Sequence, residues 1–188
     1  MSNKAYQRAH HILRSFSSSN VWTLLKAYTT YVRPILEYAT TIWSPYLNKD
    51  KIKVERVQRF FTRMICQRCK IPYSSYNDRL YKLNISSLEY RRLEFDLMFL
   101  YKLLNGLLDI NAKDFFYFNI THYNTRSHSK VIRPKLPFRN LNQNNFYSHR
   151  CATTWNLLPP EIVSAPTYDV FKNRLKRFNL RTIATLLF

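Results

Sequence analysis

Cysteine and histidine are the residue types in this chain whose spacing first suggests chemistry. Cys66 and Cys69 form a CxxC pair, and His149 with Cys151 would complete a four-ligand zinc site of the thiolate and imidazole type. The CxxC pair, however, falls near the end of a predicted helix without the usual turn residues, and a single intervening residue is a poor ligand spacing for His149 and Cys151. We therefore favour the alternative, in which the cysteines are small buried apolar residues, and expect neither a metal nor another cofactor.

Acidic residues offer little for catalysis. The 11 Asp and Glu are scattered singly and no two are adjacent, so a two-metal site for phosphoryl transfer would need distant residues. No oxyanion hole or orienting acid is evident for a Cys and His pair. The single glycine, Gly106, excludes Gly-rich phosphate loops and the dinucleotide-binding fingerprint. We expect this chain by itself to be no enzyme.

Positive charge is the remaining chemical feature. The 188 residues include 30 Lys and Arg, for a formal net charge of +19, and 46% are hydrophobic. That apolar content is enough for a folded core, so the charge must be displayed on the surface of a folded body. Such a surface favours a polyanionic partner, and RNA, DNA or an RNA/DNA hybrid is the first candidate.

The clearest arrangement of cations lies on a helix predicted over residues 49–69. Its apolar residues share one face, and only Asp50 and Glu55 dilute the positive stripe on the other side. Regularly spaced cations on a helix can follow a phosphate backbone, although an ordinary solvated basic face has the same pattern. The candidate phosphate contacts here are Lys49, Lys53, Arg56, Arg59 and Arg63.

A second basic region lies between Asp114 and Glu161, where the chain has no acidic residue. Its polar, Pro-punctuated sequence up to about residue 142 predicts loops or short strands. The candidate phosphate contacts in it are Arg126, Lys130, Arg133, Lys135 and Arg139. Most aromatic residues of the chain should be core, but those interleaved with these cations are candidates for base stacking: Tyr117, Tyr123, Phe138 and Tyr147.

Hydrophobic periodicity and the scarcity of glycine predict a mainly α fold. Asn48 should cap the helix over 49–69, and Ser86 with Glu89 forms a capping box for a long, largely buried helix over 87–105 that Gly106 ends. In that helix Arg91, Arg92, Glu94 and Asp96 should form ion pairs at spacings of three or four. Further helices are expected over residues 4–16, 21–32, 34–43, 76–83, 144–155 and 168–179.

This pattern divides the chain into a helical domain over 1–108, a basic linker or loop region over 109–142 and a C-terminal helical segment over 143–188. An odd number of cysteines and no leader after Met1 favour an intracellular protein, nuclear or cytoplasmic. No apolar run approaches the ~18 residues of a membrane span, so we expect no membrane partner.

Several strings of the sequence, taken in order, resemble the region that follows the polymerase core in non-LTR (LINE-type, jockey-like) retrotransposon reverse transcriptases. The upstream strings are VRPILEYATTIWSPY at 32–46, VERVQRF at 54–60, DRL at 78–80, LEYRR at 88–92, DL at 96–97 and YKLLNG at 101–106. The downstream strings are TRS at 125–127, Arg150, WNLLP at 155–159, and Phe171-Lys172 with Leu175. The resemblance covers essentially residues 14–178.

The resemblance implies that the chain corresponds to the helical thumb and C-terminal tail of an RNA-directed DNA polymerase encoded by a transposable element. The family's paired-aspartate palm motif and its endonuclease have no counterpart here, so no catalytic residue can be carried over. What the resemblance implies is a supporting role, in which thumb helices grip template and primer and the missing palm and endonuclease domains are further partners. Trp43 and Trp155 look like structural signatures of that family.

Two other functions remain open from the sequence. A helical protein-interaction or structural domain could carry its charge for solubility alone. A genomic remnant that folds poorly is the third alternative, motivated by a truncated-looking start and by the apolar area that a lost palm would expose.

Overall fold

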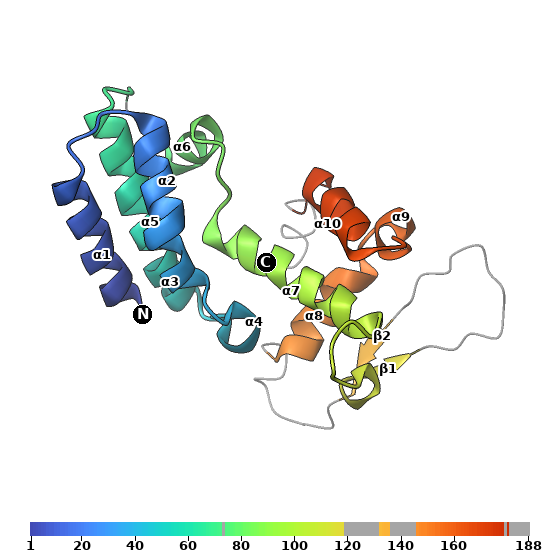
Figure 1. Cartoon of the computed structure of the whole chain (residues 1–188). Helices are drawn as coiled ribbons and strands as arrows, with labels where there is room; N and C mark the ends of the chain where they lie inside the picture. Colours follow the sequence, from blue (N-terminus) through green and yellow to red (C-terminus); the bar gives the residue numbers. More distant parts are fainter. Residues whose placement is uncertain (73, 119–131, 136–145, 179, 181–188) are drawn as a thin grey trace. The chain divides into compact units, whose positions relative to one another are not determined.

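The computed structural model describes residues 1–72, 74–118, 132–135, 146–178 and 180, and its fold is mainly α, with one two-stranded sheet in this part of the chain (Figure 1). This confirms the predicted fold class. The chain forms two compact units, Met1–Arg92 and Leu93–Phe188, here called the N-terminal and C-terminal units. This division falls inside a helix, whereas the sequence placed a boundary after residue 108. None of the helices in the described ranges is long and apolar enough to cross a membrane.

The N-terminal unit is built on three long helices, α1 (Ser2–Ser15), α2 (Val21–Tyr31) and α5 (Asn48–Arg68), which lie side by side (Figure 1). Two short helices, α3 (Arg33–Glu37) and α4 (Thr40–Trp43), connect α2 to α5, and α6 (Tyr76–Lys82) packs on α5. The first turn of α7 (Leu88–Leu104) completes the unit.

Helices α1 and α5 run in the same direction, and their contacts advance together along both. The Tyr6 hydroxyl donates to the Arg56 carbonyl at 3.1 Å, and the His10 ring lies 4.7 Å from the ring of Phe60. Further on, Arg68 donates to the carbonyl of Leu13 at 2.6 Å and to that of Phe16 at the end of α1. A guanidinium there satisfies carbonyls that the helix itself leaves without partners.

The core of the N-terminal unit fills the space between these helices. Ala5 and Ala9 of α1 are fully buried, and their small side chains allow the α1 backbone to approach its neighbours closely. Tyr28 of α2 packs on Phe61 of α5, with ring centroids 5.0 Å apart. The remaining members of this core are Ile12, Leu13, Leu24, Ala27, Val32, Leu36, Val54, Val57, Ile65, Leu83 and Leu88.

A buried carboxylate of α5 accepts hydrogen bonds from the first residue of α7. Both carboxylate oxygens of Glu55 lie 3.1 Å from the Leu88 amide nitrogen, which donates to them, and the Tyr76 hydroxyl also donates to Glu55. Gln58, one turn further along α5, accepts from the Tyr28 hydroxyl at 2.8 Å and donates to Tyr76 at 3.0 Å. Polar groups of three helices and of the start of α7 therefore satisfy one another inside the unit.

The C-terminal unit contains most of α7, the 3-10 turn η1 (Ala112–Asp114) and the helices α8 (Tyr147–Asn156), α9 (Pro160–Val163) and α10 (Tyr168–Arg177). Strands β1 (Phe116–Phe118) and β2 (Ile132–Pro134) pair antiparallel, with Tyr117 opposite Arg133. The Asn156 side chain exchanges two hydrogen bonds with the backbone of Ile132 and so ties β2 to α8.

The interior of the C-terminal unit is aromatic and holds a buried ion pair. The Tyr101 ring stacks on Phe171 at 4.4 Å, and Trp155, which is 1% exposed, lies beside the same phenylalanine. Arg150 of α8 donates to both oxygens of Asp96 on α7, at 2.8 and 3.1 Å. Asp96 is 3% exposed, so its charge depends on this bidentate partner.

The ends of the helices confirm one cap predicted from the sequence and contradict two others. Gly106 has a φ of +66° and follows the end of α7, as predicted. The capping box at Ser86 was wrong, because the hydroxyl that accepts from the first turn, from the Tyr90 amide, belongs to Ser87. Asn48 does not cap α5, whose N-cap is Leu47 without a side-chain bond.

Three other local predictions need correction. The helix expected over 34–43 is two helices, because Ala39 adopts a left-handed conformation with φ +52°. Phe146, which falls within the helix expected over 144–155, instead precedes α8 and is 49% exposed. Two charged residues of α7 make long-range ion pairs that helical spacing did not predict, since Arg91 binds Glu37 of α3 and Asp96 binds Arg150.

We expect the stability of the N-terminal unit to depend on the protonation of Glu55. Burial raises the pKa of this carboxyl above its ordinary value, although hydrogen bonds from Tyr76 and Leu88 oppose the rise. The folded chain therefore holds its proton to higher pH than the unfolded chain, and stability falls as pH rises from the ordinary pKa through the raised one. Unfolding by urea between about pH 4 and pH 8 should show this trend in the wild type and a weaker one in Glu55→Gln.

The matched control for this measurement is Glu89→Gln, which removes an acid that is half-exposed and paired with Lys51 at 2.8 Å. The charge of Glu89 is only a minor cause of the raised pKa of Glu55, so this variant should keep most of the pH trend of the wild type. Equal pH trends in the wild type and Glu55→Gln would contradict the assignment.

The ion pair of the C-terminal unit should be costly to break. Asp96→Asn leaves the Arg150 guanidinium, which is largely buried, without its counter-charge, and should lower the unfolding free energy by about 3 kcal/mol. Tryptophan fluorescence during denaturant unfolding measures this, because Trp155 is buried in the same unit. Asp109→Asn, at an exposed position, should change stability by less than about 0.5 kcal/mol. A loss of similar size in both variants would refute the role given to the pair.

Candidate nucleic-acid interface

Helix α5 presents a cationic face to solvent. The apolar residues predicted to pack, among them Val54, Val57, Phe61 and Ile65, are buried on its other side. The five candidate phosphate contacts are all exposed, and we call them the cationic face: Lys49, Lys53, Arg56, Arg59 and Arg63. Because the apolar side of the helix packs against the unit, the cationic side chains on the other side point to solvent.

The length of the cationic face suits a nucleic-acid backbone. From Lys49 to Arg63 the helix extends about 21 Å, because it rises about 1.5 Å per residue. The bases of one strand rise by about 3.4 Å each, so the cationic face is as long as about six base pairs. A helix of this length can meet several successive phosphates.

The two acids expected to dilute this charge behave differently. Glu55 is 8% exposed and binds the Leu88 amide, so it does not reach the surface, and the prediction that it dilutes the stripe was wrong. Asp50 stays partly exposed at the first turn of α5. The exposed charge of the middle of the helix is therefore entirely positive.

Not every cation near α5 is available to a ligand. Lys51 pairs with Glu89 at 2.8 Å, and Arg68 binds the carbonyls that end α1. Within the cationic face, the Arg59 guanidinium lies 4.6 Å from the Tyr76 ring centroid, which holds the side chain in place while leaving it exposed. These contacts separate structural cations from those that can meet phosphates.

A smaller basic and aromatic group lies on the two-stranded sheet of the C-terminal unit. Tyr117 is 55% exposed, sits opposite the exposed Arg133, and has the Lys135 ammonium 5.5 Å from its ring centroid. The same ammonium donates to the Lys113 carbonyl at 3.0 Å. Three predicted site residues, Tyr117, Arg133 and Lys135, are thus brought together on one hairpin.

Tyr147 has structural contacts of its own. Its hydroxyl donates to the Asp96 carbonyl at 2.9 Å, its ring meets Phe99 edge-on at 5.4 Å, and burial raises its pKa above the ordinary value. These contacts favour a role in packing over base stacking. The other predicted candidates, Arg126, Lys130, Arg139, Tyr123 and Phe138, lie outside the described residues.

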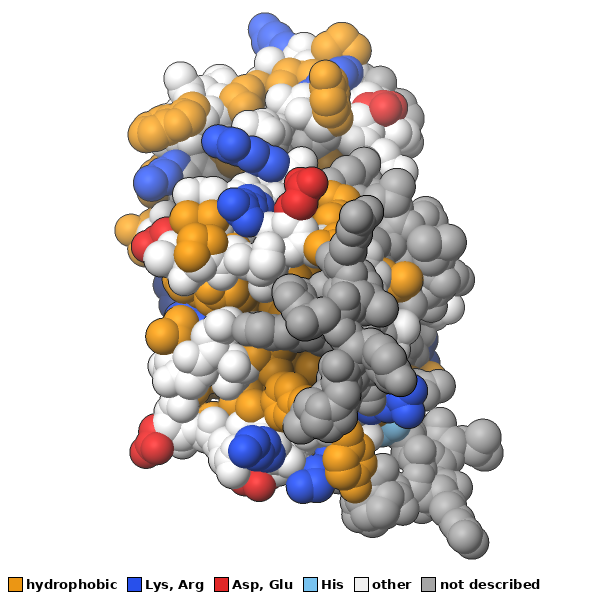
Figure 2. Space-filling model, turned by 90° about the vertical axis from the view of Figure 1, so that its right-hand side faces the viewer, with side chains coloured by type: hydrophobic (Ala, Val, Ile, Leu, Met, Phe, Trp, Pro, Cys, Tyr) orange, Lys and Arg blue, Asp and Glu red, His pale blue; other side chains and the backbone are white. Residues whose placement is uncertain are grey.

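Exposed cations also occur on α10, among them Arg174, Lys176 and Arg177. On the face of the molecule shown in Figure 2, the visible Lys and Arg side chains are spread between apolar ones instead of forming a single patch. Among the described elements, α5 therefore offers the most regular row of cations.

The cysteines show no metal-binding arrangement in the described part of the chain, where no three His, Cys, Asp or Glu residues are grouped so as to hold an ion. Cys66 belongs to the N-terminal unit and is buried in α5, while His149 and Cys151 belong to α8 in the C-terminal unit. Burial raises the pKa of both Cys66 and Cys151, which disfavours the thiolate that a metal requires.

One hollow of the N-terminal unit was missed by sequence reasoning. It is lined by eleven residues at the start of α1, on α4 and at the start of α5, and encloses about 670 Å³. Trp43 was interpreted only as a structural signature. Its position beside the hollow depends on the left-handed residue Ala39, which interrupts the helix expected over 34–43 and which no local sequence pattern predicted.

A comparison with known proteins finds a distant relative. The chain is 31% identical over 106 residues to an uncharacterized protein of Caenorhabditis elegans, a match that covers 56% of this chain and 54% of that protein. The chain thus spans about half the length of this relative. No protein-family model matches the sequence, and no solved structure matches it.

Proposed function

We propose that this chain binds RNA, DNA or an RNA/DNA hybrid through phosphate contacts made by the cationic face of α5. The single observation that carries this proposal is the row of five exposed cations on one side of a helix whose other side is buried. Contacts with phosphates position a nucleic acid without reading its sequence, so the binding should be sequence-independent.

The origin of the chain is part of the same proposal. The ordered strings that resemble LINE-type reverse transcriptases support a role as a non-catalytic C-terminal portion of such a polymerase, in which the helical N-terminal unit grips template and primer. The catalytic aspartates would then belong to a palm domain outside this chain.

Exposed apolar side chains favour a second candidate, a surface for binding another protein. Ile42 and Tyr38, on and before α4, are 83% and 78% exposed, and Trp22 of α2 is 71% exposed. Isolated apolar residues on a surface are common, whereas contiguous apolar patches are typical of interfaces, and Tyr38 and Ile42 lie four positions apart in the chain. Protein binding through apolar contacts would depend little on salt, which separates the two candidates.

We expect affinity for a duplex to fall steeply with salt, and the cationic face to account for most of the fall. Each phosphate contact contributes about −0.9 to the slope of log K against log salt concentration. Replacing all five residues of the cationic face by Gln should reduce the magnitude of the slope by about 4.5 and weaken binding at low salt. Fluorescence anisotropy with a labelled duplex at several salt concentrations measures both.

The control is a variant with the same loss of charge at five exposed positions elsewhere. These positions are Lys4, Arg8, Lys26, Lys82 and Lys113, each changed to Gln. The control should keep most of the wild-type slope, and thermal melts should show that both variants fold. Absence of duplex binding at low salt, or equal slopes for the two variants, would overturn the proposal.

A further inference from the structure

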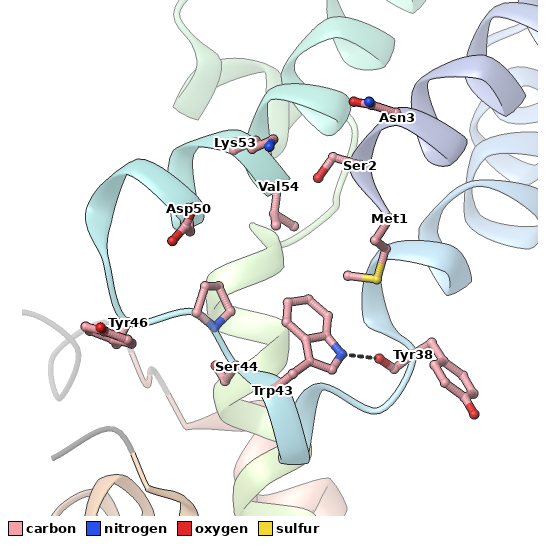
Figure 3. Close-up of a pocket in the computed structure, with 11 residues that line it drawn as sticks. Met1, Ser2, Asn3, Tyr38, Trp43, Ser44, Tyr46, Asp50, Lys53 and Val54 are labelled. Carbon is pink, nitrogen blue, oxygen red and sulfur yellow. Dashed lines mark hydrogen bonds between the residues drawn. The ribbon is translucent and has the colours of Figure 1, made fainter. Parts of the chain in front are cut away.

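A hollow of about 670 Å³ lies at the end of the N-terminal unit where α1 and α5 both begin (Figure 3). We call it the terminal hollow; its lining is Met1, Ser2, Asn3, Tyr38, Trp43, Ser44, Pro45, Tyr46, Asp50, Lys53 and Val54. Its volume falls within the ~300–1,000 Å³ typical of small-molecule sites, and the hollow is more open to solvent than enclosed. All its walls belong to one compact unit.

The walls of the terminal hollow suit a flat, largely apolar ring. Trp43 stands in the middle of the group, with Tyr46 on one side and Tyr38 on the other, although the Tyr38 ring points away (Figure 3). The Trp43 indole N–H donates to the Tyr38 carbonyl, so the orientation of the indole is fixed before a ligand arrives. Aromatic side chains held in this way are stacking platforms for nucleobases.

The charge of the lining decides between a ring and a phosphate. The side chains of Asp50 and Lys53 in the wall carry opposite charges, so no cluster of cationic side chains is present there to hold a phosphate inside. Lys53 also belongs to the cationic face, and Lys49 lies one turn before it on α5. A strand held by these lysines would therefore have its phosphates on α5 and a base near the hollow.

The wall carries polar groups of the kinds that pair with the edge of a base. The Ser2 and Ser44 hydroxyls donate and accept hydrogen bonds, and the Asp50 carboxylate accepts from an exocyclic amine such as that of cytosine or adenine. An apolar platform with a few polar groups at its rim is the usual composition of a site for a heterocycle.

We propose that the terminal hollow holds an unpaired nucleobase, at the end of the same strand whose phosphates contact the cationic face. The inference rests on the proposed nucleic-acid binding and adds to it a preference for strands that end in unpaired nucleotides. A base inside a duplex is stacked on its neighbours and cannot enter, whereas an overhanging base has lost one of those neighbours.

The test compares three duplexes that are equal except at one end: blunt, with an overhang of about three nucleotides, and with an overhang of abasic sites. Overhangs of both strand polarities are included. We expect the wild type to bind one of the base-bearing overhangs about tenfold more tightly than the blunt duplex, and the abasic overhang no more tightly than the blunt one. A 2-aminopurine in the preferred overhang should be quenched on binding.

Two variants locate the site, and one controls for loss of an exposed aromatic ring. Trp43→Leu and Tyr46→Ser should each abolish the preference for the overhang and leave affinity for the blunt duplex unchanged. Because Trp43 also packs against the core, Tyr46, which is 50% exposed, provides the variant least able to disturb folding. Tyr81→Ser removes a tyrosine that is 88% exposed on α6 and should keep the preference.

The outcomes separate this inference from the proposed function. Salt-dependent binding of the blunt duplex without any gain from overhanging bases overturns the base site alone. A gain that abasic overhangs also give, or that survives both Trp43→Leu and Tyr46→Ser, overturns it as well. Failure to bind any of the duplexes at low salt overturns the proposed function and the base site together.

Discussion

The carboxylate of Glu55 is the polar group around which the N-terminal unit is organised. It accepts the first amide of α7 and the Tyr76 hydroxyl, and Gln58 beside it joins α2 and α6 to the same network. A carboxylate at a helix start compensates both the unpaired amides and the positive end of the helix dipole. Because this interaction holds one side of α5 against α7, and the apolar face packs against α1 and α2, the remaining side of α5 is left to solvent with its cations.

The net charge of +19 is divided between two physical roles. One group of cations binds carbonyls or carboxylates within the fold: Arg68, Arg91 and Arg150. Lys51 likewise pairs with Glu89. In the described part of the N-terminal unit, none of the five residues of the cationic face pairs with a carboxylate. The chain therefore uses arginine to connect helices at positions of low exposure, and leaves a regular row of cations where packing directs them outward.

Local patterns predicted much of this structure, and long-range contacts account for most of what they missed. The helix over 49–69 and the exposure of Arg56 and Arg63 follow from periodicity alone. Glu55 lies close to the Arg59 side of the helical wheel, so only the docking of α7 reveals that it is buried. The pairing of Asp96 with Arg150 joins residues 54 positions apart, which no spacing rule for helices can anticipate. The terminal hollow could not be predicted from local patterns, because it depends on the interruption of the helix at Ala39 and on the packing of α1 against α5.

The parallel arrangement of α1 and α5 has a consequence for the electric field of the N-terminal unit. Two parallel helices place their positive dipole ends together, here at residues Ser2 and Asn48, and their negative ends together at the opposite end. Arg68 meets the negative end of α1 with a full positive charge, which offsets the cost of aligning the two dipoles. The backbone amides at the end of the bundle near Trp43 thereby contribute a positive potential that does not itself depend on the titration of side chains.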